Sequence, residues 1–333
     1  MMSEEEPLFE DATFYQKRKH GQWCAVEAPV MEGPVADTHA HLQMMRDPAL
    51  SLARAGAHHV GFVEAIVDPA DDGFATFGAL PGWLMEAAGD LRRITSEPGE
   101  DVHGCVVALP RVRIAAGVHP HNASMFTPEL EAALVARLAD RRVSAVGEIG
   151  LDYHYDLSPR EVQREVFRTQ LRLAKAAGLP VCLHMREAHD DGFAILSEEG
   201  FPEAGTLLHC FNLDAAEVAR WVEAGCYIAF GGPLTFKKAD EVREAARAVP
   251  IDRLLTETDA PYMTPEPLRG ALCGPAHVVW TADVLCDVLG AATADERRAL
   301  LTQLYANATG LLNREPTAWQ LSAASESEER AHA

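Results

Sequence analysis

Six histidine and acidic side chains in this sequence have the chemistry of metal ligands. They stand at or directly after the ends of short apolar segments, and they are His39, His41, Glu148, His184, His209 and Asp259. Imidazole nitrogens and carboxylate oxygens are the ligands that Zn²⁺, Mn²⁺ and similar ions take in proteins. One such histidine alone is more often an ordinary hydrogen-bonded residue than a ligand. Whether the six form a metal site depends on the strands that carry them.

Eight short segments rich in Val, Ile and Leu carry these residues or lie between them. Such segments are typical of strands that are buried on both faces of a parallel sheet. The predicted strands are 35–41, 59–67, 112–117, 143–149, 179–184, 205–210, 225–230 and 253–257.

Amphipathic stretches with helix-start signals alternate with the predicted strands. The predicted starts are the capping box from Ser158 to Glu161, with Pro159 at its first helical position, then Thr127-Pro128, Asp214 to Glu217, and the capping box from Thr293 to Glu296. The long span 68–111 is predicted to be a decorated loop with a helix of its own near 81–94.

Strands and helices that alternate in this way predict a parallel sheet with right-handed crossovers. The number of strands and the length of the chain favour a single α/β domain, a (β/α)₈ TIM-type barrel over 34–313. Residues 1–33 are interpreted as an N-terminal extension without clear periodicity, and 314–333 as a flexible, solvated tail.

In such a barrel all strand ends of one polarity meet at one face, where active sites lie. His39 and His41 are two residues apart, so both point inward from the first strand. Six donors are therefore expected to converge on one mouth, enough for two ions that share a bridging carboxylate. Glu148, on a central strand, is the natural bridge. Ordinary core packing is the alternative, and it does not readily explain six such residues at strand ends.

Charge and composition restrict the class of protein. The chain has 29 Lys and Arg against 50 Asp and Glu, a formal charge of −21, which argues against binding nucleic acid by a broad basic face. The charge does not exclude an enzyme that binds one or two phosphates locally through metal ions. No apolar run is long enough for a membrane span, the N-terminus is acidic, and the seven cysteines form no CxxC pair, so a reducing cytoplasm is expected. The oligomeric state is left open.

The ordered motifs around these residues resemble those of TatD-type metal-dependent hydrolases, within the amidohydrolase-like barrel superfamily. They are HAH at 39–41, GVHPH at 117–121, GEIGLDY at 147–153, LHMR at 183–186, LHCF at 208–211 and ETDAPY at 257–262. The resemblance spans about 35–312. It implies a (β/α)₈ fold, two divalent metal ions and, for characterised relatives, deoxyribonuclease activity on DNA ends or single strands. Some relatives are associated with removing misattached amino acids from tRNA.

The resemblance also implies a division of ligands between two ions. One ion would take His39, His41, Glu148 and Asp259, and the second would take Glu148, His184 and His209. Two loops depart from the family pattern, since ALCGP follows Gly270 and Asn212-Leu213 follows Phe211. Both loops are expected to line the substrate groove, so the departures bear on substrate choice more than on the chemistry.

We expect hydrolysis of a phosphodiester with nucleic acid as the substrate. Glu148 and Asp259 are the predicted catalytic residues, with Asp259 both a ligand and a general base. Asp37 and Glu257 each lie two residues before a ligand and are expected to orient the His39 and His41 rings. Pairing with a barrel-interior Arg or Lys is the alternative for these two acids.

Several further residues are candidates for contact with the substrate. They are His119, His121, Arg186, Lys237 and Arg269 for phosphate, and Asp152 and Tyr153 for the shape of the groove. Each has an ordinary structural alternative. One of the two histidines could stabilise the turn at Pro120, and Arg186 could form an ion pair with Asp190 or Asp191.

Two other functions remain compatible with this sequence. The same site could hydrolyse a carbonyl substrate, such as an aminoacyl-tRNA ester or a cyclic amide. The second function is that of a barrel that only binds a partner protein. The complete set of candidate metal ligands weighs against it. Zn²⁺, Mn²⁺ and Mg²⁺ are all compatible with the ligands.

Overall fold

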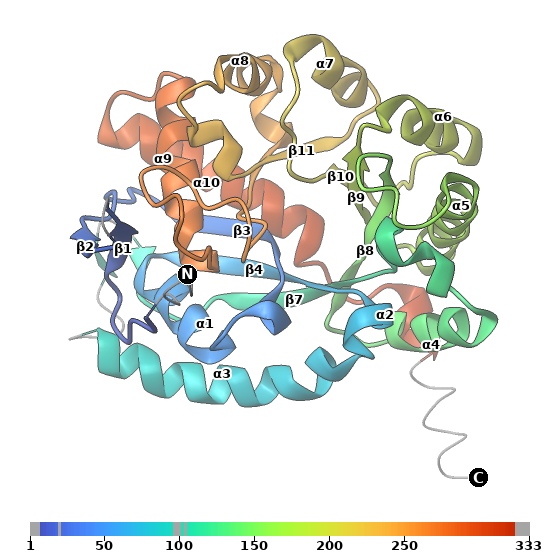
Figure 1. The fold of residues 1–333 in the computed structure, drawn as a ribbon, viewed down its shortest axis with the longest axis horizontal. Helices are drawn as coiled ribbons and strands as arrows, with labels where there is room; N and C mark the ends of the chain where they lie inside the picture. The colour runs from blue at the N-terminus through green and yellow to red at the C-terminus, as the bar shows by residue number, and fades with distance from the viewer. Residues whose placement is uncertain (1–6, 19–20, 96–100, 103–104, 324–333) are drawn as a thin grey trace.

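The computed structural model describes residues 7–18, 21–95, 101–102 and 105–323. Eight parallel strands form one curved sheet in the order β12-β11-β10-β9-β8-β7-β4-β3, with helices packed around it (Figure 1). This confirms the (β/α)₈ fold and all eight predicted strands. Their bounds are β3 (Val35–Ala40), β4 (Val60–Val67), β7 (Arg111–Ala116), β8 (Val143–Asp152), β9 (Val181–Arg186), β10 (Thr206–Leu208), β11 (Tyr227–Phe230) and β12 (Leu254–Thr256).

The strands are apolar on both sides because each side faces a different part of the core. One set of buried side chains fills the barrel interior, and the other packs against the surrounding helices. The interior set includes Ala36, Phe62, Ile66, Ala115, Ala145, Cys182, Leu207, Ala229 and Leu255. These side chains pack into one buried cluster, so the barrel is filled rather than open.

Ten α-helices surround the strands in the described part of the chain (Figure 1). They are α1 (Pro48–Ala57), α2 (Pro69–Asp72), α3 (Ala75–Ile94), α4 (Pro128–Leu138), α5 (Arg160–Ala177), α6 (His189–Glu199), α7 (Ala215–Glu223), α8 (Asp240–Ala248), α9 (Val278–Val288) and α10 (Ala294–Leu312). Short 3₁₀ turns are η1 (Leu42–Met44), η2 (Pro120–Met125), η3 (Gly232–Thr235), η4 (Ile251–Arg253) and η5 (Pro275–His277). No helix among the described residues is long and apolar enough to cross a membrane.

The helix starts at Thr127, Asp214 and Thr293 are confirmed, because each side chain accepts a backbone N–H of the first turn. The capping box at Ser158 is wrong. Helix α5 begins at Arg160, and the Ser158 hydroxyl instead donates to the carbonyl oxygen of His121 at 2.8 Å. The hydroxyl is drawn away from the helix because it ties two loops together at the barrel mouth.

Helix α3 also differs from its prediction. It begins at Ala75 rather than near 81, and Pro81 lies inside it. The first turn is held by Asp72, whose carboxylate accepts the backbone N–H and the hydroxyl of Thr76. Proline tends to mark the start of a helix, so the sequence favoured a start that was one and a half turns late.

An antiparallel hairpin precedes the barrel, which the sequence had not indicated. It pairs β1 (Phe14–Lys17) with β2 (Trp23–Val26), and Phe14 is buried against the barrel. Arg54 on α1 donates to the carbonyl oxygen of Thr13 at 2.7 Å. A second small hairpin pairs β5 (Asp101–Val102) with β6 (Cys105–Val106).

Part of the expected solvated tail, 314–323, is anchored to the barrel at one buried residue, although its other side chains are exposed or half-buried. Gln320 is 1% exposed, and its amide donates to the carbonyl oxygens of Leu138, Asp140 and Val143 at 2.9, 3.2 and 3.1 Å. This segment therefore packs against the barrel through hydrogen bonds that its polar composition does not reveal. Residues 324–333 lie outside the described residues.

The first and last strands meet along a seam that side chains close. The Thr256 hydroxyl donates to the carbonyl oxygen of Ala36 at 2.7 Å, and the Thr38 hydroxyl donates to that of Thr256 at 3.1 Å. Ala40, the last residue of β3, and Ala260, after β12, form an isolated parallel bridge. Threonine hydroxyls thus replace much of a backbone ladder between β3 and β12.

Replacing Thr256 by valine is expected to lower the free energy of unfolding by about 1–2 kcal/mol, because a buried carbonyl loses its donor while the side-chain shape is kept. Urea unfolding of the variant and the parent would measure the change. Thr309→Val, at a hydroxyl bonded only within α10, is the control and should cost less. Equal losses at both positions would contradict a special role for the seam.

A buried histidine beside the hairpin makes stability depend on pH. Burial lowers the pKa of His277 from 6.5 to about 3, and its Nδ1 accepts the backbone N–H of Gly274 at 3.0 Å. Its contribution is complete above the unfolded pKa and is lost as the pH falls from 6.5 toward 3. Between about pH 7.5 and pH 5 this loss amounts to about 2 kcal/mol.

Urea unfolding at those two pH values measures this effect. His277→Asn should lose about 2 kcal/mol less than the parent on acidification. The control is His154→Asn, at an exposed histidine. This variant should lose as much stability as the parent when the pH is lowered. If His277→Asn loses as much stability as the parent, the ring is not a source of acid sensitivity.

Candidate metal centre

The six candidate ligands are brought together at one end of the barrel. They come from the carboxyl-terminal halves of β3, β8 and β9 and from the segments that follow β3, β10 and β12. A cavity of about 550 Å³ opens there and is lined by His41, Glu148, His184, His209 and Asp259. His39 is fully buried beneath it, at 0% exposure. The predicted convergence on one mouth is therefore present in the structure.

Glu148 is the centre of this group. Its Oε1 atom lies 2.7 Å from His184 Nδ1 and 2.7 Å from His209 Nε2. Its Oε2 atom lies 3.3 Å from His39 Nε2 and 3.9 Å from His41 Nε2. Each carboxylate oxygen thus faces a different pair of imidazoles, which is the arrangement that a bridging ligand needs.

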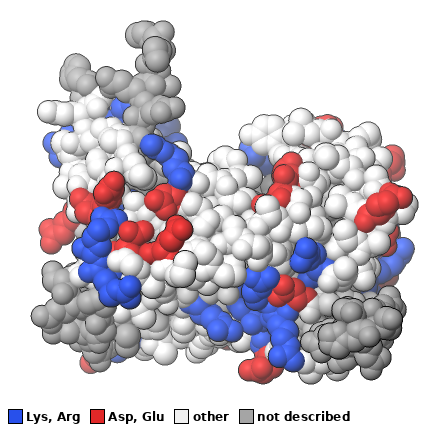
Figure 2. All heavy atoms as spheres, turned by 90° about the horizontal axis from the view of Figure 1, so that it is seen from below, with Lys and Arg blue, Asp and Glu red and all other residues white. Residues whose placement is uncertain are grey.

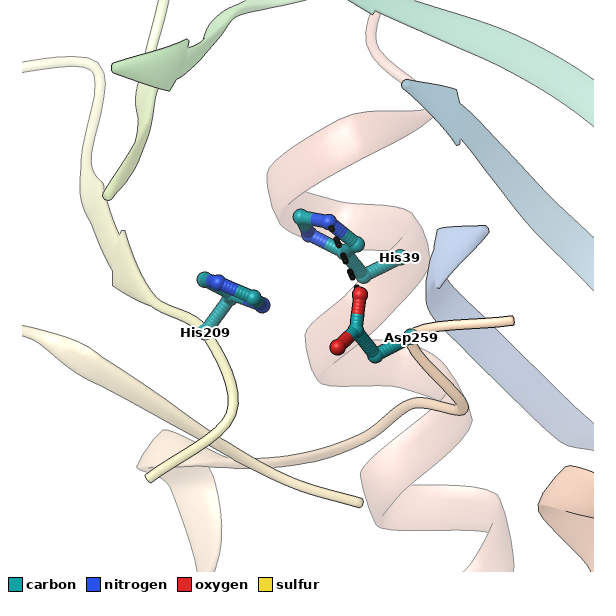
Figure 3. A group of neighbouring side chains, drawn as sticks. All are labelled: His39, His209 and Asp259. Carbon is teal, nitrogen blue, oxygen red and sulfur yellow. Dashed lines mark ion pairs between the residues drawn. The ribbon is translucent and has the colours of Figure 1, made fainter. Parts of the chain in front are cut away.

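Asp259 closes the group from the loop after β12. Its Oδ1 atom lies 3.8 Å from His39 Nε2 and 3.6 Å from His41 Nε2. Figure 3 shows His39, His209 and Asp259 turned toward one another from three separate segments. The His39 and His209 rings are stacked, with their centroids 4.0 Å apart. Asp259 has a φ of 58°, a left-handed conformation that aspartate tolerates better than most residues.

The charges of this group are strongly coupled. Burial alone would raise the pKa of Glu148, but His209 and His39 outweigh it and hold that pKa well below its ordinary value. Burial would also raise the pKa of Asp259, but the imidazoles of His41 and His209 outweigh it and lower that pKa. Burial lowers the pKa of His39. Both carboxylates are thus ionised, as metal ligands must be. Although burial opposes it, neighbouring carboxylates raise the pKa of His184 and His209, so these two rings would have to lose a proton to bind an ion.

The chemistry and geometry of these donors fit divalent metal ions. His39 Nε2 is buried and has no hydrogen-bond partner among the described residues, although it faces Glu148 and Asp259. Three sets of donor atoms lie close enough together for an ion, and Glu148 belongs to two of them. The sets are His39, His41 and Glu148, then His39, His209 and Asp259, then His119, Glu148 and His184.

The third of these sets includes a histidine that the sequence assigned to the substrate. His119 Nε2 lies 3.7 Å from Glu148 Oε1, at the edge of the ligand group. Its ring also packs edge-on against that of His184, with centroids 4.5 Å apart. His119 therefore lies with the ligands as well as in the lining of the cavity.

Asp152 lies behind His184, one of the candidate ligands. Its Oδ2 atom is 3.1 Å from His184 Nε2 and 2.8 Å from His121 Nε2. Burial alone would raise the pKa of Asp152, but the hydrogen bonds from these two histidines lower it. A carboxylate in this position fixes the ring of His184, with Nδ1 toward Glu148. The sequence had assigned Asp152 to the shape of the groove.

Asp37 and Glu257 contact other groups than the rings of His39 and His41, which they were predicted to orient. Asp37 instead accepts the backbone N–H and the hydroxyl of Thr258, at 2.9 and 2.7 Å. Glu257 accepts the backbone N–H of Cys210 at 2.6 Å, and its Oε1 lies 3.6 Å from His209 Nδ1. The strand period placed both acids inside the barrel, but it did not show which neighbour each would reach.

The predicted substrate contacts divide into two groups. His119, His121, Asp152 and Arg186 line the cavity, with the Arg186 guanidinium 4.6 Å from the centre of the Tyr155 ring. The alternative ion pair of Arg186 is contradicted, since Asp190 pairs with Arg220 and Asp191 with Arg164. The remaining three predicted contacts, Tyr153, Lys237 and Arg269, lie outside the lining of this cavity.

Those three residues have other positions. The Tyr153 hydroxyl donates to Asp191 Oδ2 at 2.7 Å, the Arg269 guanidinium lies 4.2 Å from the centre of the Phe236 ring, and Lys237 is exposed. The cavity also has lining residues that the sequence reasoning did not assign, among them Asp68, Asp71, Asn122, Tyr155, Leu157 and Tyr262. Asp68 directly follows β4, so the rule that found the other strand-end residues would have found it too.

Comparisons with known proteins agree with this geometry. The family model described as "TatD related DNase" matches residues 36–312. The chain is 34% identical over 267 residues to YcfH of Escherichia coli K12, called an uncharacterized metal-dependent hydrolase, and the match covers 78% of this chain and 90% of that protein. It is 38% identical over 155 residues to the 3'-5' ssDNA/RNA exonuclease TatD of Klebsiella pneumoniae, covering 46% and 59%. The crystal structure of YJJV, a TatD homologue from Escherichia coli, superimposes with a TM-score of 0.70 at 27% identity, covering 85% and 100%.

Proposed function

The chain belongs to the TatD related DNase family of metal-dependent hydrolases, and from this premise we propose that it is a two-metal nuclease. Its substrate would be DNA, cut at phosphodiester bonds near ends or in single strands. The observation that carries this proposal is the position of Glu148, with each carboxylate oxygen within 4 Å of a different pair of imidazoles. A relative named as a ssDNA/RNA exonuclease supports the choice of substrate.

The ligands would divide between two ions that share Glu148. His39, His41 and Asp259 would hold one ion with it, and His184 and His209 would hold the other. When bound, the ions would polarise the phosphate and ease the deprotonation of water near neutral pH. Zn²⁺, Mn²⁺ and Mg²⁺ all suit such imidazole and carboxylate ligands, and Zn²⁺ is favoured by the number of histidines.

The residues of the chain would then bind the substrate and move the proton. Asp259 is ionised and lines the cavity, so its carboxylate can accept the proton of the attacking water. Arg186, with its guanidinium held over Tyr155 at the cavity, would bind a phosphate through its fork of N–H groups. His121 would stay in place through its contact with Asp152.

The overall charge of −21 does not oppose this function. Binding would rest on one or two phosphates at the mouth rather than on a basic surface. Two divalent ions would add four positive charges to a mouth that carries the carboxylates of Glu148, Asp259 and three further aspartates, and so would offset most of its negative charge. Binding should accordingly be weak without metal and only moderately sensitive to salt.

A parallel assay of substrates tests the proposal. The purified protein would be given 3'-labelled single-stranded DNA, the matching duplex, an aminoacyl-tRNA and a cyclic amide, each with Mg²⁺, Mn²⁺ or Zn²⁺. We expect metal-dependent shortening of the single strand, faster than of the duplex, and loss of activity with a chelator. Hydrolysis of only the ester or the amide would replace the nuclease by the carbonyl hydrolase that the same ligands allow.

A further inference from the structure

A second cavity lies at the end of the barrel opposite the metal centre, where β7 and β8 begin. Its volume is also about 550 Å³. The face that carries α3 and α4 is seen in Figure 2, where Lys and Arg side chains gather in groups rather than being spread evenly. The cavity is lined by Leu80, Pro81, Leu84, Pro110, Arg111, Val112, Arg113, Arg141, Arg142, Glu315 and Pro316.

The lining is positive although the protein as a whole is strongly negative. It includes four arginines and one glutamate, in a chain with a formal charge of −21. Arg142 is already engaged, since its guanidinium donates to Asp140 and to the carbonyl oxygen of Phe77. Arg111 and Arg141 are exposed, and the described residues offer neither of them a hydrogen bond or an ion pair. Two guanidinium groups at this cavity are therefore free to bind an anion.

A third arginine, Arg113, adds a buried charge that forms no ion pair with the described residues, although Glu64, Glu315 and Asp140 lie near enough to act on it. Arg113 is only 6% exposed, and its Nη2 donates to the carbonyl oxygen of Arg314 at 3.1 Å. Its Nε is buried and has no hydrogen-bond partner in the described part of the chain. Burial raises the pKa of the neighbouring Glu64 to about 8, so that carboxyl is largely uncharged near pH 7. A buried cation without a full set of partners favours an anion beside it.

The rest of the lining is apolar. Leu80, Pro81 and Leu84 come from α3, and Pro110 and Pro316 face them from the chain before β7 and after α10. A cavity of this volume suits a small organic molecule rather than a bare ion. Its occupant should therefore combine an anionic group with an apolar body.

From this juxtaposition we propose that the cavity binds a small organic phosphate of the nucleoside monophosphate type, with a phosphate at one end and a largely apolar body. Arg111 and Arg141 bind the phosphate oxygens through their N–H groups, because planar guanidinium matches phosphate well. The buried Arg113 supplies charge at the floor. The apolar body of the ligand packs against the α3 side of the cavity. The site is separate from the metal centre and does not depend on the proposed nuclease function.

Calorimetric titration of the full chain tests the proposal, with a chelator present so that metal ions contribute nothing. The probes are deoxyadenosine 5′-monophosphate, inorganic phosphate and deoxyadenosine. We expect saturable binding of the monophosphate, weaker binding of phosphate and none of the nucleoside. Arg111→Gln and Arg141→Gln should each weaken binding of the monophosphate about tenfold, since each removes hydrogen bonds to a charged group.

Arg18→Gln is the matched control, because Arg18 is also exposed and its replacement changes the net charge equally. It should leave the affinity unchanged. Thermal unfolding would verify that all three variants fold, as is expected for exposed side chains. The proposal is overturned if the monophosphate does not bind saturably, or if Arg18→Gln weakens binding as much as the other two variants do. It is also overturned if a double variant, with both Arg111 and Arg141 replaced by glutamine, keeps the parental affinity.

Discussion

Replacing Glu148 by glutamine is expected to lower the rate of metal-dependent hydrolysis by a factor of about 10³ or more. The amide keeps the size of the side chain but loses its charge and one of its two acceptor oxygens. Both proposed ions depend on those oxygens, which lie 2.7 Å from His184 Nδ1 and 3.3 Å from His39 Nε2. Metal analysis of protein purified without chelator should therefore show fewer than two equivalents, together with the loss of rate.

The control for this variant is another buried glutamate of the same barrel. Glu64 on β4 is fully buried, and burial raises its pKa to about 8. Its carboxyl, which contacts the Ser144 hydroxyl, is thus largely protonated near neutral pH and resembles an amide. Glu64→Gln should keep both the metal content and the rate. A Glu148→Gln protein with two equivalents of metal and the parental rate would rule out the shared ligand.

Asp259→Asn is expected to lower kcat by a factor of about 10²–10⁴, the usual contribution of a general base. Asparagine adopts the left-handed backbone conformation as readily as aspartate, so the loss would arise from chemistry rather than from folding. The Glu148, His184 and His209 group should keep its ion. We therefore expect the metal content to fall by no more than one equivalent, measured beside the rate on single-stranded DNA.

Asp156→Asn is a matched control for the backbone conformation. Asp156 also has a positive φ, 55°, and lies outside the lining of the cavity. Its replacement should leave kcat unchanged. Full activity of Asp259→Asn would remove Asp259 from the proton transfer and leave it, at most, a ligand.

The barrel and its mouth could be predicted from the sequence because both depend on local patterns. Strands buried on two faces have few polar residues, so a histidine or acid at a strand end stands out. His184 at the end of an apolar run is an example, and His209 is another. Parallel strands then bring such positions together without further information. Asp68, directly after β4, obeys the same rule and lines the same cavity.

The partners of particular side chains could not be predicted, since they depend on register and on rotamers. Asp37 and Glu257 were placed inside the barrel, yet they reach Thr258 and Cys210 rather than the rings of His39 and His41. The packing of 314–323 also escaped prediction. Its anchor is one glutamine amide that meets three carbonyls far away in the sequence, and no composition signals that.

With the proposed ion bound, the seam between β3 and β12 would make metal supply a determinant of how long the protein lasts. His39 and His41 belong to one side of that seam and Asp259 to the other, so an ion held by all three would fasten them together. A cation at a hundred times its dissociation constant adds about 2.7 kcal/mol to folding stability. In a cell deprived of that cation, the barrel would open more often at the seam between β3 and β12. Proteases would then shorten the lifetime of the protein, even with substrate still present.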